Sequence, residues 1–539
     1  MATSSETKLL IATAVVAYVV GKRWWAKRGS DVGRLKKPAG AHWLWGHEYE
    51  AWDTLDGQFY IKNIDELGQA FGMKGGLFHS DILALTDPAA ISHMFTKHPY
   101  EYTKSQIIRP LIDRLLGKSL VWAEGDQHKR QRQVLAPVFT NENVKAMDNE
   151  IHRAADKLVE VLREHVLSQQ AEKGDGGGAR VNILDWSGRA TLDVIGAVGF
   201  GHDFQCGTSE EAKAITRSWR ELILMGMEFP GFVAPLVIRA FPIITDLPVE
   251  AIQAQGEIKT IVKRIAKQLV EERRAMQNDE GMKSGKDLMS TLLKWNQNAE
   301  GEDLDQLLDH ICTFVMVGHE TISNALNFAL YELARNPEMQ DKLRKEMTEF
   351  VGSGPGGEPT YEEYQSQLPY LDAVCKEGLR MYPPASHTER IALADDVLPL
   401  RFPVTTPSGE QLSSIRVKRG QLINVPTIAI NRSHTVWGPD AEVFRPERWL
   451  DAGGLPAPTS LTQGWSGIFS FLEGPRICIG FRLALFEYKV IMTTLLKNFE
   501  FKDTGAVLKT QFSSNLQPFV EGRKQDGIQI PLIVKDLHQ

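Results

Sequence analysis

The sequence contains few cysteines, and none of them lie in a pair. The 539 residues include four, Cys206, Cys312, Cys375 and Cys478. Because no Cys-x-x-Cys pair is present, the cysteines favour neither a disulfide framework nor a cysteine zinc site. This usage is typical of a protein in a reducing compartment.

The chain also lacks an excess of positive charge. Its formal net charge is -7, and no basic stripe is interleaved with aromatic residues, so a nucleic-acid partner is not expected. Linkers, internal repeats and shifts in composition are missing from the main part of the chain. We therefore expect residues 46–539 to form one large catalytic domain.

A long hydrophobic run is missing as well. Residues 9–21 are uncharged and make a helix of about 20 Å, whereas the hydrocarbon core of a bilayer is about 30 Å thick. Trp24 and Trp25 can extend this apolar segment into the headgroup region, and positive charges follow it at Lys22, Arg23, Lys27 and Arg28. A cleaved signal peptide carries its charges on the other flank. The sequence thus predicts a membrane anchor at residues 1–28, a hinge at residues 29–45 and a cytosolic body.

Helical periodicity dominates that body. Apolar residues recur at spacings of three and four in residues 143–167, 252–276, 304–333 and 339–350. Strand-like segments are short and gather in residues 76–85 and 398–427. The predicted fold is mainly α with small β-sheets.

Two motifs match known signatures only in part. Residues 352–357, GSGPGG, fit Gly-x-Gly-x-x-Gly, but they follow a charged helical run instead of a strand and contain Pro355. His319 and Glu320 begin the zinc-protease motif His-Glu-x-x-His, but Ser323 stands in place of the second histidine. Neither a dinucleotide site nor a zinc protease is predicted.

The most informative stretch is FLEGPRICIGFRLALFE, residues 471–487. It sets Cys478 between Gly474 and Gly480, with Arg476 two residues before the cysteine and an apolar helical run after it. The positive end of a helix dipole favours a thiolate, and the glycines let the backbone approach something flat. A thiolate ligand on a haem iron, with Arg476 for a haem propionate, would use all of these features. The alternative, a buried small hydrophobe, suits the other three cysteines.

The spacing Phe471-x-x-Gly474-x-Arg476-x-Cys478-x-Gly480 resembles the haem-binding signature of the cytochrome P450 superfamily of haem-thiolate monooxygenases. Three further segments match this family in the same order, so the resemblance covers the whole chain. It implies the cytochrome P450 fold and a haem b cofactor (iron protoporphyrin IX), with Cys478 as the axial thiolate of the iron.

The first of these segments is YLDAVCKEGLRMYPP. Its Glu377 and Arg380 resemble the family's Glu-x-x-Arg pair, and Arg448 in FRPERW resembles the third member of that network. Trp449 stands where the family more often has Phe. The resemblance implies a structural role in the core, whereas the alternative for the pair is a solvated surface contact.

The second segment is GDQHKRQRQVLAPVF. Its Arg132 resembles a helix residue that contacts a haem propionate, and His128 stands where many members carry Trp. Arg390, in HTERIA, resembles a third propionate partner. A solvated basic face is the alternative for the run around Arg132.

The third segment is VGHETIS, in the middle of the long helix expected at residues 304–333, and it resembles the family's oxygen-binding segment. The resemblance implies that Gly318 thins the helix toward the haem, that Glu320 is the acid and that Thr321 holds water near bound oxygen. Val317 and Ile322 depart from the residues more often found there. The alternative for Thr321 is a hydroxyl bonded to a carbonyl one turn earlier.

The implied reaction inserts one oxygen atom of O2 into a C–H bond, with Glu320 and Thr321 relaying protons. Because no flavin or nicotinamide motif is present, electrons would come from NADPH through a separate cytochrome P450 reductase, with cytochrome b5 as a further candidate donor. The anchor and the haem signature resemble fungal microsomal members, which implies the endoplasmic reticulum membrane. Two alternatives stay open, a reductase-independent haem-thiolate enzyme (peroxygenase, isomerase or nitric oxide reductase) and a non-enzymatic haem sensor.

Substrate contacts are expected, by analogy with the family, from residues 105–120 and 224–244 and from Phe314, Val317, Ser386 and His387. These positions are largely apolar and aromatic. A lipophilic substrate such as a terpenoid, sterol, fatty acid or aromatic compound is therefore expected.

Overall fold

The fold is that of a computed structural model, which describes residues 29–77, 79–105, 108–173, 178–241, 257–278, 287–298, 304–353, 357–513 and 515–538. The predicted anchor at residues 1–28 lies outside this part of the chain. Most of the described residues are helical, with four small sheets, as the sequence predicts.

The α-helices, in chain order, are α2 (Glu48–Asp53), α3 (Gln58–Leu67), α4 (Pro88–Ser92), α5 (Ile108–Leu116), α6 (Gly125–Leu135), α7 (Asn141–Lys145), α8 (Asp148–Lys173), α9 (Leu184–Ile195), α10 (Glu210–Met227), α11 (Phe229–Ala240), α13 (Glu257–Asn278), α14 (Leu288–Asn298), α15 (Leu304–Arg335), α16 (Pro337–Ser353), α17 (Tyr361–Ser366), α18 (Pro369–Met381), α19 (Thr427–Arg432), α20 (His434–Trp437) and α21 (Phe481–Asn498).

The strands are β1 (Ala70–Met73), β2 (Ile82–Leu85), β3 (Tyr102–Thr103), β4 (Ala179–Asn182), β5 (Thr388–Ala392), β6 (Asp396–Thr405), β7 (Gln411–Val417), β8 (Leu422–Val425), β9 (Phe499–Asp503), β10 (Leu508–Phe512), β11 (Leu516–Val520) and β12 (Pro531–Asp536). The largest sheet has the order β1-β2-β8-β5-β3, and the smaller ones are β10-β11, β4-β12-β9 and β6-β7. In the large sheet β2 and β8 are parallel, and the other neighbours are antiparallel.

Local signals set several of the helix ends. Ser209 caps α10 by accepting from the amide of Ala212, and Pro369 occupies the first turn of α18, where a missing N–H costs nothing. The run expected as one helix over residues 143–167 is instead divided into α7 and α8. The second helix starts afresh at Asp148, whose charge suits a helix N-terminus.

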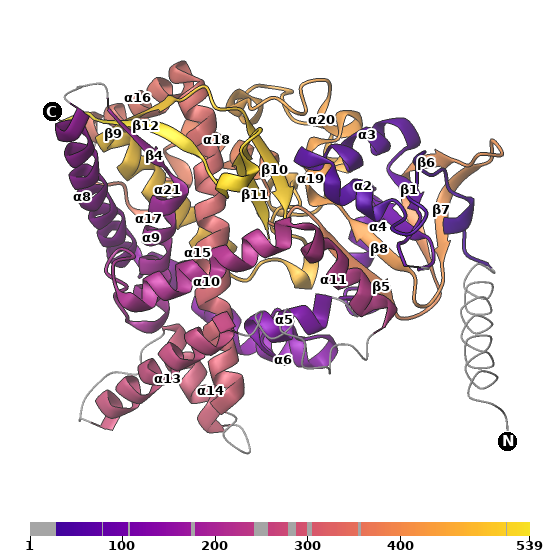
Figure 1. Cartoon of the computed structure of the whole chain (residues 1–539), viewed down its shortest axis with the longest axis horizontal. Helices are drawn as coiled ribbons and strands as arrows, with labels where there is room; N and C mark the ends of the chain where they lie inside the picture. The colour runs from indigo at the N-terminus through magenta and orange to yellow at the C-terminus, as the bar shows by residue number, and fades with distance from the viewer. Residues whose placement is uncertain are drawn as a thin grey trace.

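The long helix α15 is the centre of the helical part. Its 32 residues make it about 48 Å long, and most of its side chains are buried. It packs against α9, α13, α18 and α21, and Figure 1 shows it running through the middle of the molecule, with the sheet of β1, β8 and β5 to one side. This arrangement lets one helix contribute residues to the interior of the whole domain.

Part of the stretch expected to be a hinge belongs to the folded body. Val32 and Leu35 are buried in the apolar core between β6, β7 and the large sheet. Asp31 forms an ion pair with Arg416 of β7 at 2.9 Å. Two apolar side chains, four and seven residues after the predicted anchor, thus pack into the folded body, and a hinge over all of residues 29–45 stays a prediction.

Among the described residues, no single helix is both long enough and apolar enough to cross a membrane. The helices α10 and α11, which are bent by 78° relative to each other, meet that test only when they are taken together.

Candidate active site

Cys478 lies in the short connection between a 3-10 turn at Gly474–Arg476 and helix α21. Its amide donates to the carbonyl of Phe471 at 2.8 Å. Gly474 has a φ of +62°, and a Cβ there would lie 2.2 Å from the carbonyl oxygen of Phe95, so only glycine fits this turn. At Gly480 the nearest such contact is Phe139, at 3.7 Å. Protein packing therefore explains the first glycine and not the second.

The thiol of Cys478 differs from the other three thiols. Its surface is exposed, whereas Cys206, Cys312 and Cys375 are buried. The sulfur is nevertheless surrounded by protein, and this burial raises its pKa, while the amide of Gly480 and the Arg132 guanidinium lower it. The amide at the start of α21 thus acts in the direction that the sequence predicts, toward the thiolate, but burial outweighs it. A bound metal would displace the proton.

Buried cationic side chains gather beside the cysteine loop. Arg132 of α6 donates to the carbonyl of Ile477 at 2.7 Å. Arg476 donates to the carbonyl of Ala123 at 3.1 Å and pairs with Glu124. Sequence positions more than 340 residues apart thus meet around one loop.

Arg390 of β5 belongs to the same cluster. Its guanidinium donates to Thr388 Oγ1 at 2.6 Å and lies 4.8 Å from the ring centre of Phe95. Burial lowers its pKa to about 10, with Glu124 raising and Arg476 lowering it. Neither Arg132 nor Arg390 forms an ion pair with any residue in the described part of the chain.

His128, one turn before Arg132 on α6, is buried and stays neutral. Its Nδ1 lies 3.1 Å from the hydroxyl of Tyr100. Burial, followed by the charges of Arg476, Lys104 and Arg132, lowers its pKa to about 3. A neutral imidazole here can donate a hydrogen bond without adding a further cation.

Lys104 is a member of this cluster that the sequence reasoning missed. Its Nζ contacts Glu124 at 2.8 Å, and burial lowers its pKa to about 7, with opposing influences from Glu124 and from Arg390 and Arg476. It directly follows the short strand β3, in a stretch of sequence that carries no recognisable motif. Only the fold brings it beside the other cations.

The predicted network around Glu377 is assembled in the core. Glu377 and Arg380 are both fully buried and form two hydrogen bonds, at 2.8 and 2.9 Å. Arg448 Nε lies 3.4 Å from the same carboxylate. Trp449, the departure from the family pattern, donates its indole N–H to Glu377 at 3.0 Å. The tryptophan therefore joins the network instead of weakening it.

On α15, Gly318 serves helix packing. A Cβ at this position would lie 2.9 Å from Cγ1 of Ile195, so the missing side chain lets α15 approach α9 closely. The expectation that Gly318 thins the helix toward the haem stays a prediction, and the contact seen for this glycine is with α9. The neighbouring Val317, Glu320 and Thr321 line a cavity instead.

Thr321 and Glu320 have different surroundings. The Thr321 hydroxyl donates to the carbonyl of Val317 at 2.8 Å, which is the local alternative that the sequence left open. Glu320 accepts long hydrogen bonds, at 3.4 Å each, from the side chains of Asn515 and Gln517, and its carboxylate lies 4.0 Å from His319 Nε2. Both groups therefore retain hydrogen-bonding capacity toward a ligand or water in the cavity.

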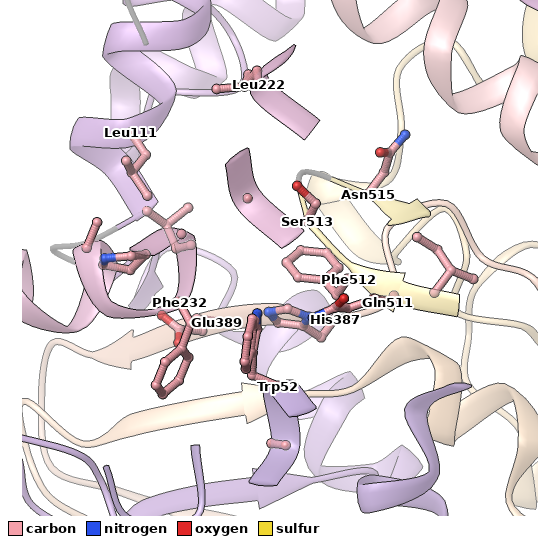
Figure 2. Close-up of a pocket in the computed structure, with 18 of the residues that line it drawn as sticks. Trp52, Leu111, Leu222, Phe232, His387, Glu389, Gln511, Phe512, Ser513 and Asn515 are labelled. Atoms are coloured by element: carbon pink, nitrogen blue, oxygen red, sulfur yellow. The ribbon is translucent and has the colours of Figure 1, made fainter. Parts of the chain in front are cut away.

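The cavity has a volume of about 540 Å³ and a mainly apolar wall. The expected segments contribute Ile108, Leu111, Phe232, Val317 and His387, among others. Phe314 does not line it and instead stacks on Phe139 at 5.7 Å. Figure 2 shows Phe232, Trp52, His387 and Phe512 approaching the cavity from different elements.

Two parts of the cavity wall escaped the sequence analysis. One is α2, which contributes Glu48 and Trp52, and the other is the β10–β11 hairpin, which contributes Gln511, Phe512 and Asn515. They lie near opposite ends of the domain sequence and carry no local signature. Their positions follow from tertiary folding alone.

Comparison with known proteins agrees with this site. The family model for cytochrome P450 matches residues 37–520. The chain belongs to the cytochrome P450 family. It is 32% identical to cytochrome P450 monooxygenase claQ of Ampulloclitocybe clavipes, over 89% of this chain and 88% of that protein. Cytochrome P450 monooxygenase 205 of Postia placenta is 29% identical, over 94% of each chain. The protein is thus an oxidoreductase of the P450 monooxygenase type.

The P450 family implies a haem iron, and the residues present fit one. An accessible thiol stands at the start of α21. The guanidiniums of Arg390 and Arg476 share a single carboxylate, Glu124, and the half-buried Arg132 beside them forms no ion pair in the described part of the chain. Buried charges require counter-charges. A haem, with two propionate carboxylates, supplies the negative charge that this cluster lacks.

Proposed function

We propose that this P450 inserts one oxygen atom from O2 into a lipophilic small molecule, such as a terpenoid, sterol, fatty acid or aromatic compound. The observation that carries the proposal is the apolar cavity, which includes Glu320 and Thr321 in its wall. A cavity of this size and polarity suits a small apolar ligand. The proposed electron source is NADPH, through a separate cytochrome P450 reductase, with cytochrome b5 as an optional second donor.

The proposed cofactor is haem b, with Cys478 as the ligand of its iron. Arg132, Arg390, Arg476 and Lys104 would hold the propionates by charge-assisted hydrogen bonds, and His128 would donate a neutral one. When bound, the haem would supply the activation of dioxygen. The protein supplies the fixed cations, the thiol and a site shielded from bulk water.

The side chains on α15 would then move protons. The hydroxyl of Thr321 can turn from the carbonyl of Val317 toward a water in the cavity, since a hydroxyl both donates and accepts. The carboxylate of Glu320, held by long contacts from Asn515, Gln517 and His319, can exchange protons with that water. An apolar wall around this pair keeps additional water away from the reacting carbon.

The proposed location is the endoplasmic reticulum membrane, with residues 1–28 as the anchor and the catalytic domain in the cytosol. Support comes from the apolar and basic pattern of that segment. We expect a variant that lacks residues 1–28 to appear in the soluble fraction with an unchanged haem spectrum. If it stays wholly in the membrane fraction, a second surface binds lipid, and α11 with its exposed Phe229 is the candidate.

The test of the proposed function uses the full chain in membranes. The reduced, carbon monoxide-bound spectrum reports the thiolate ligand, and turnover of a lipophilic panel is measured with and without reductase plus NADPH. We expect a red-shifted thiolate band and product only when reductase and NADPH are present. A thiolate band with reductase-independent turnover would favour a peroxygenase or isomerase, and a band without turnover would favour a haem sensor.

A further inference from the structure

The apolar cavity has one polar region, on the large sheet. Glu389 of β5 and Asn424 of β8 are direct partners across this antiparallel pair, and both line the cavity. Directly opposed residues have Cβ atoms about 4.5–5.5 Å apart on the same face. The register of the two strands therefore places a carboxyl group and an amide side by side in the cavity wall.

Glu389 has capacity left for a ligand. It accepts a hydrogen bond from Ser105 Oγ at 2.8 Å, and within the described part of the chain it forms no ion pair. The nearby Glu48 is already paired with Arg239, at 2.8 Å. The carboxylate of Glu48 is thus engaged in an ion pair, whereas the carboxyl group of Glu389 is available to a ligand.

Asn424 has an unused acceptor. Its side chain is only 8% exposed and hydrogen-bonds with the hydroxyl of Tyr60, which also lines the cavity. Its Oδ1 is buried without a hydrogen-bond partner. A buried carbonyl oxygen without a partner costs free energy, and a donor on a ligand would remove that cost.

We propose that Glu389 and Asn424 anchor a hydroxyl group of the substrate, so that the enzyme oxidises a lipophilic molecule that already carries an alcohol. This inference rests on the proposed function. The anchor lies on the sheet, whereas Glu320 and Thr321 lie on α15, so the recognised hydroxyl and the oxidised carbon belong to different parts of the substrate. A preceding hydroxylation or reduction would have to supply such a substrate.

A neutral hydroxyl fits this position better than an ionised group does. A substrate carboxylate would meet Glu389 and Glu48. A substrate ammonium would find its counter-charge only in an ionised Glu389, because Glu48 is paired with Arg239. Burial also raises the pKa of Glu389, although Ser105 and Arg239 oppose this. A protonated carboxyl group both donates to and accepts from an alcohol, and Asn424 Oδ1 accepts the alcohol proton.

The cavity provides a matched control in Gln511. Its Oε1 is also buried without a partner, but Gln511 lies on β10, in a different sheet from Glu389 on β5 and Asn424 on β8, and Figure 2 draws it apart from Glu389. A hydroxyl held at Glu389 and Asn424 would not depend on Gln511. Gln511→Met therefore removes an unpartnered amide oxygen from the same cavity, as Asn424→Val does, but at a different place.

The experiment measures binding to the haem-loaded full chain by calorimetry, with no turnover required. The probes are 1-dodecanol, farnesol and cholestanol, each compared with its methyl ether, which keeps the oxygen but lacks the donor. The variants are Glu389→Leu, Glu389→Gln, Asn424→Val and Gln511→Met, and the thermal midpoint of each one reports folding.

We expect the unmodified protein to bind at least one alcohol about 10-fold more tightly than its ether. Glu389→Leu and Asn424→Val should each remove most of that preference, and Glu389→Gln and Gln511→Met should keep it. The proposal is overturned if no pair shows a preference, if both Leu and Val variants retain it, or if only Gln511→Met loses it. Loss of the preference in Glu389→Gln would show that it depends on the charge of a carboxylate and not on hydrogen bonding alone, and would overturn the anchor as proposed.

The two proposals fail in different ways. A normal thiolate spectrum and reductase-dependent turnover without any alcohol preference would overturn the anchor alone. An absent thiolate band in the unmodified protein would overturn the proposed function before any binding is measured.

Discussion

Around Cys478 the side chains are held by short, charged contacts, whereas around Thr321 they line an apolar cavity with few fixed partners. Arg132 and Arg476 donate to backbone carbonyls of the surrounding segments, at 2.7 and 3.1 Å. Glu320, by contrast, has contacts of 3.4 Å, and Thr321 bonds only within its own helix. One region is preorganised by charge, and the other keeps hydrogen-bonding capacity free.

This difference matches what each region has to do. A propionate-bearing cofactor stays in place, so its partners gain from rigid, buried cations. A substrate and its protons enter and leave, so the groups that handle them need unsatisfied capacity and room to turn. We therefore expect substitutions beside Cys478 to change cofactor binding and those beside Thr321 to change the outcome of turnover.

The largest effect is expected for Cys478→Ala, which removes the proposed iron ligand. No thiolate band should remain in the reduced, carbon monoxide-bound spectrum. The matched control is Cys312→Ala, since that thiol is buried in the core and its pKa is raised to about 12 by burial. The control should keep the band, and a thiolate band in Cys478→Ala would remove this cysteine from the site.

Thr321→Ala should leave haem content and substrate affinity nearly unchanged but should divert oxygen chemistry to hydrogen peroxide. Product per NADPH should fall by about 10²- to 10⁴-fold, the usual contribution of an acid–base group. The measurement is product and peroxide formed per NADPH. The control is Ser323→Ala. Ser323 also lies on α15, but its hydroxyl contacts Ser187 instead of lining the cavity. Equal coupling in Thr321→Ala and the unmodified protein would exclude Thr321 from proton delivery.

Glu377→Ala tests the buried network of Glu377, Arg380 and Arg448 in the core. It leaves Arg380 and Arg448 buried without their carboxylate, so the free energy of unfolding should fall by about 3–5 kcal/mol. Chemical denaturation of both proteins measures the change. Glu362→Ala breaks an exposed pair with Lys145 and should change nothing measurable. If Glu377→Ala is as stable as the unmodified protein, the hydrogen bonds from Arg380 and Arg448 to backbone carbonyls are sufficient to keep these arginines buried.

The smallest effect is expected for His387→Gln, in the cavity wall. Burial lowers the pKa of His387 to about 4, below its ordinary value of 6.5. The unfolded chain therefore binds the extra proton first, and stability is lost as the pH falls from 6.5 toward 4. His387→Gln should reduce this loss by about 2 kcal/mol at pH 5. Identical stability curves between pH 7 and 4 would show that His387 is not enclosed in solution.

Local sequence predicted much of the helical body. The apolar spacing of residues 304–333 identified α15 within two residues at its C-terminal end, and Pro369 marked the start of α18. The break between α7 and α8 escaped prediction because no proline or glycine marks it. Val32 and Leu35 were assigned to a hinge because their partners in the core come from separate segments, tens to hundreds of residues further along the chain.

The sequence by itself determined the cysteine loop and the Glu377 pair, because fixed spacings along one segment set their geometry. It also indicated that Glu320 and Thr321 are neighbours on one helix. Only the tertiary structure decided that Gly318 packs on Ile195, that Lys104 joins the buried cations, and that Glu389 faces Asn424. These contacts join segments far apart in the chain, and their register depends on how the sheet and α15 pack, which no local pattern encodes.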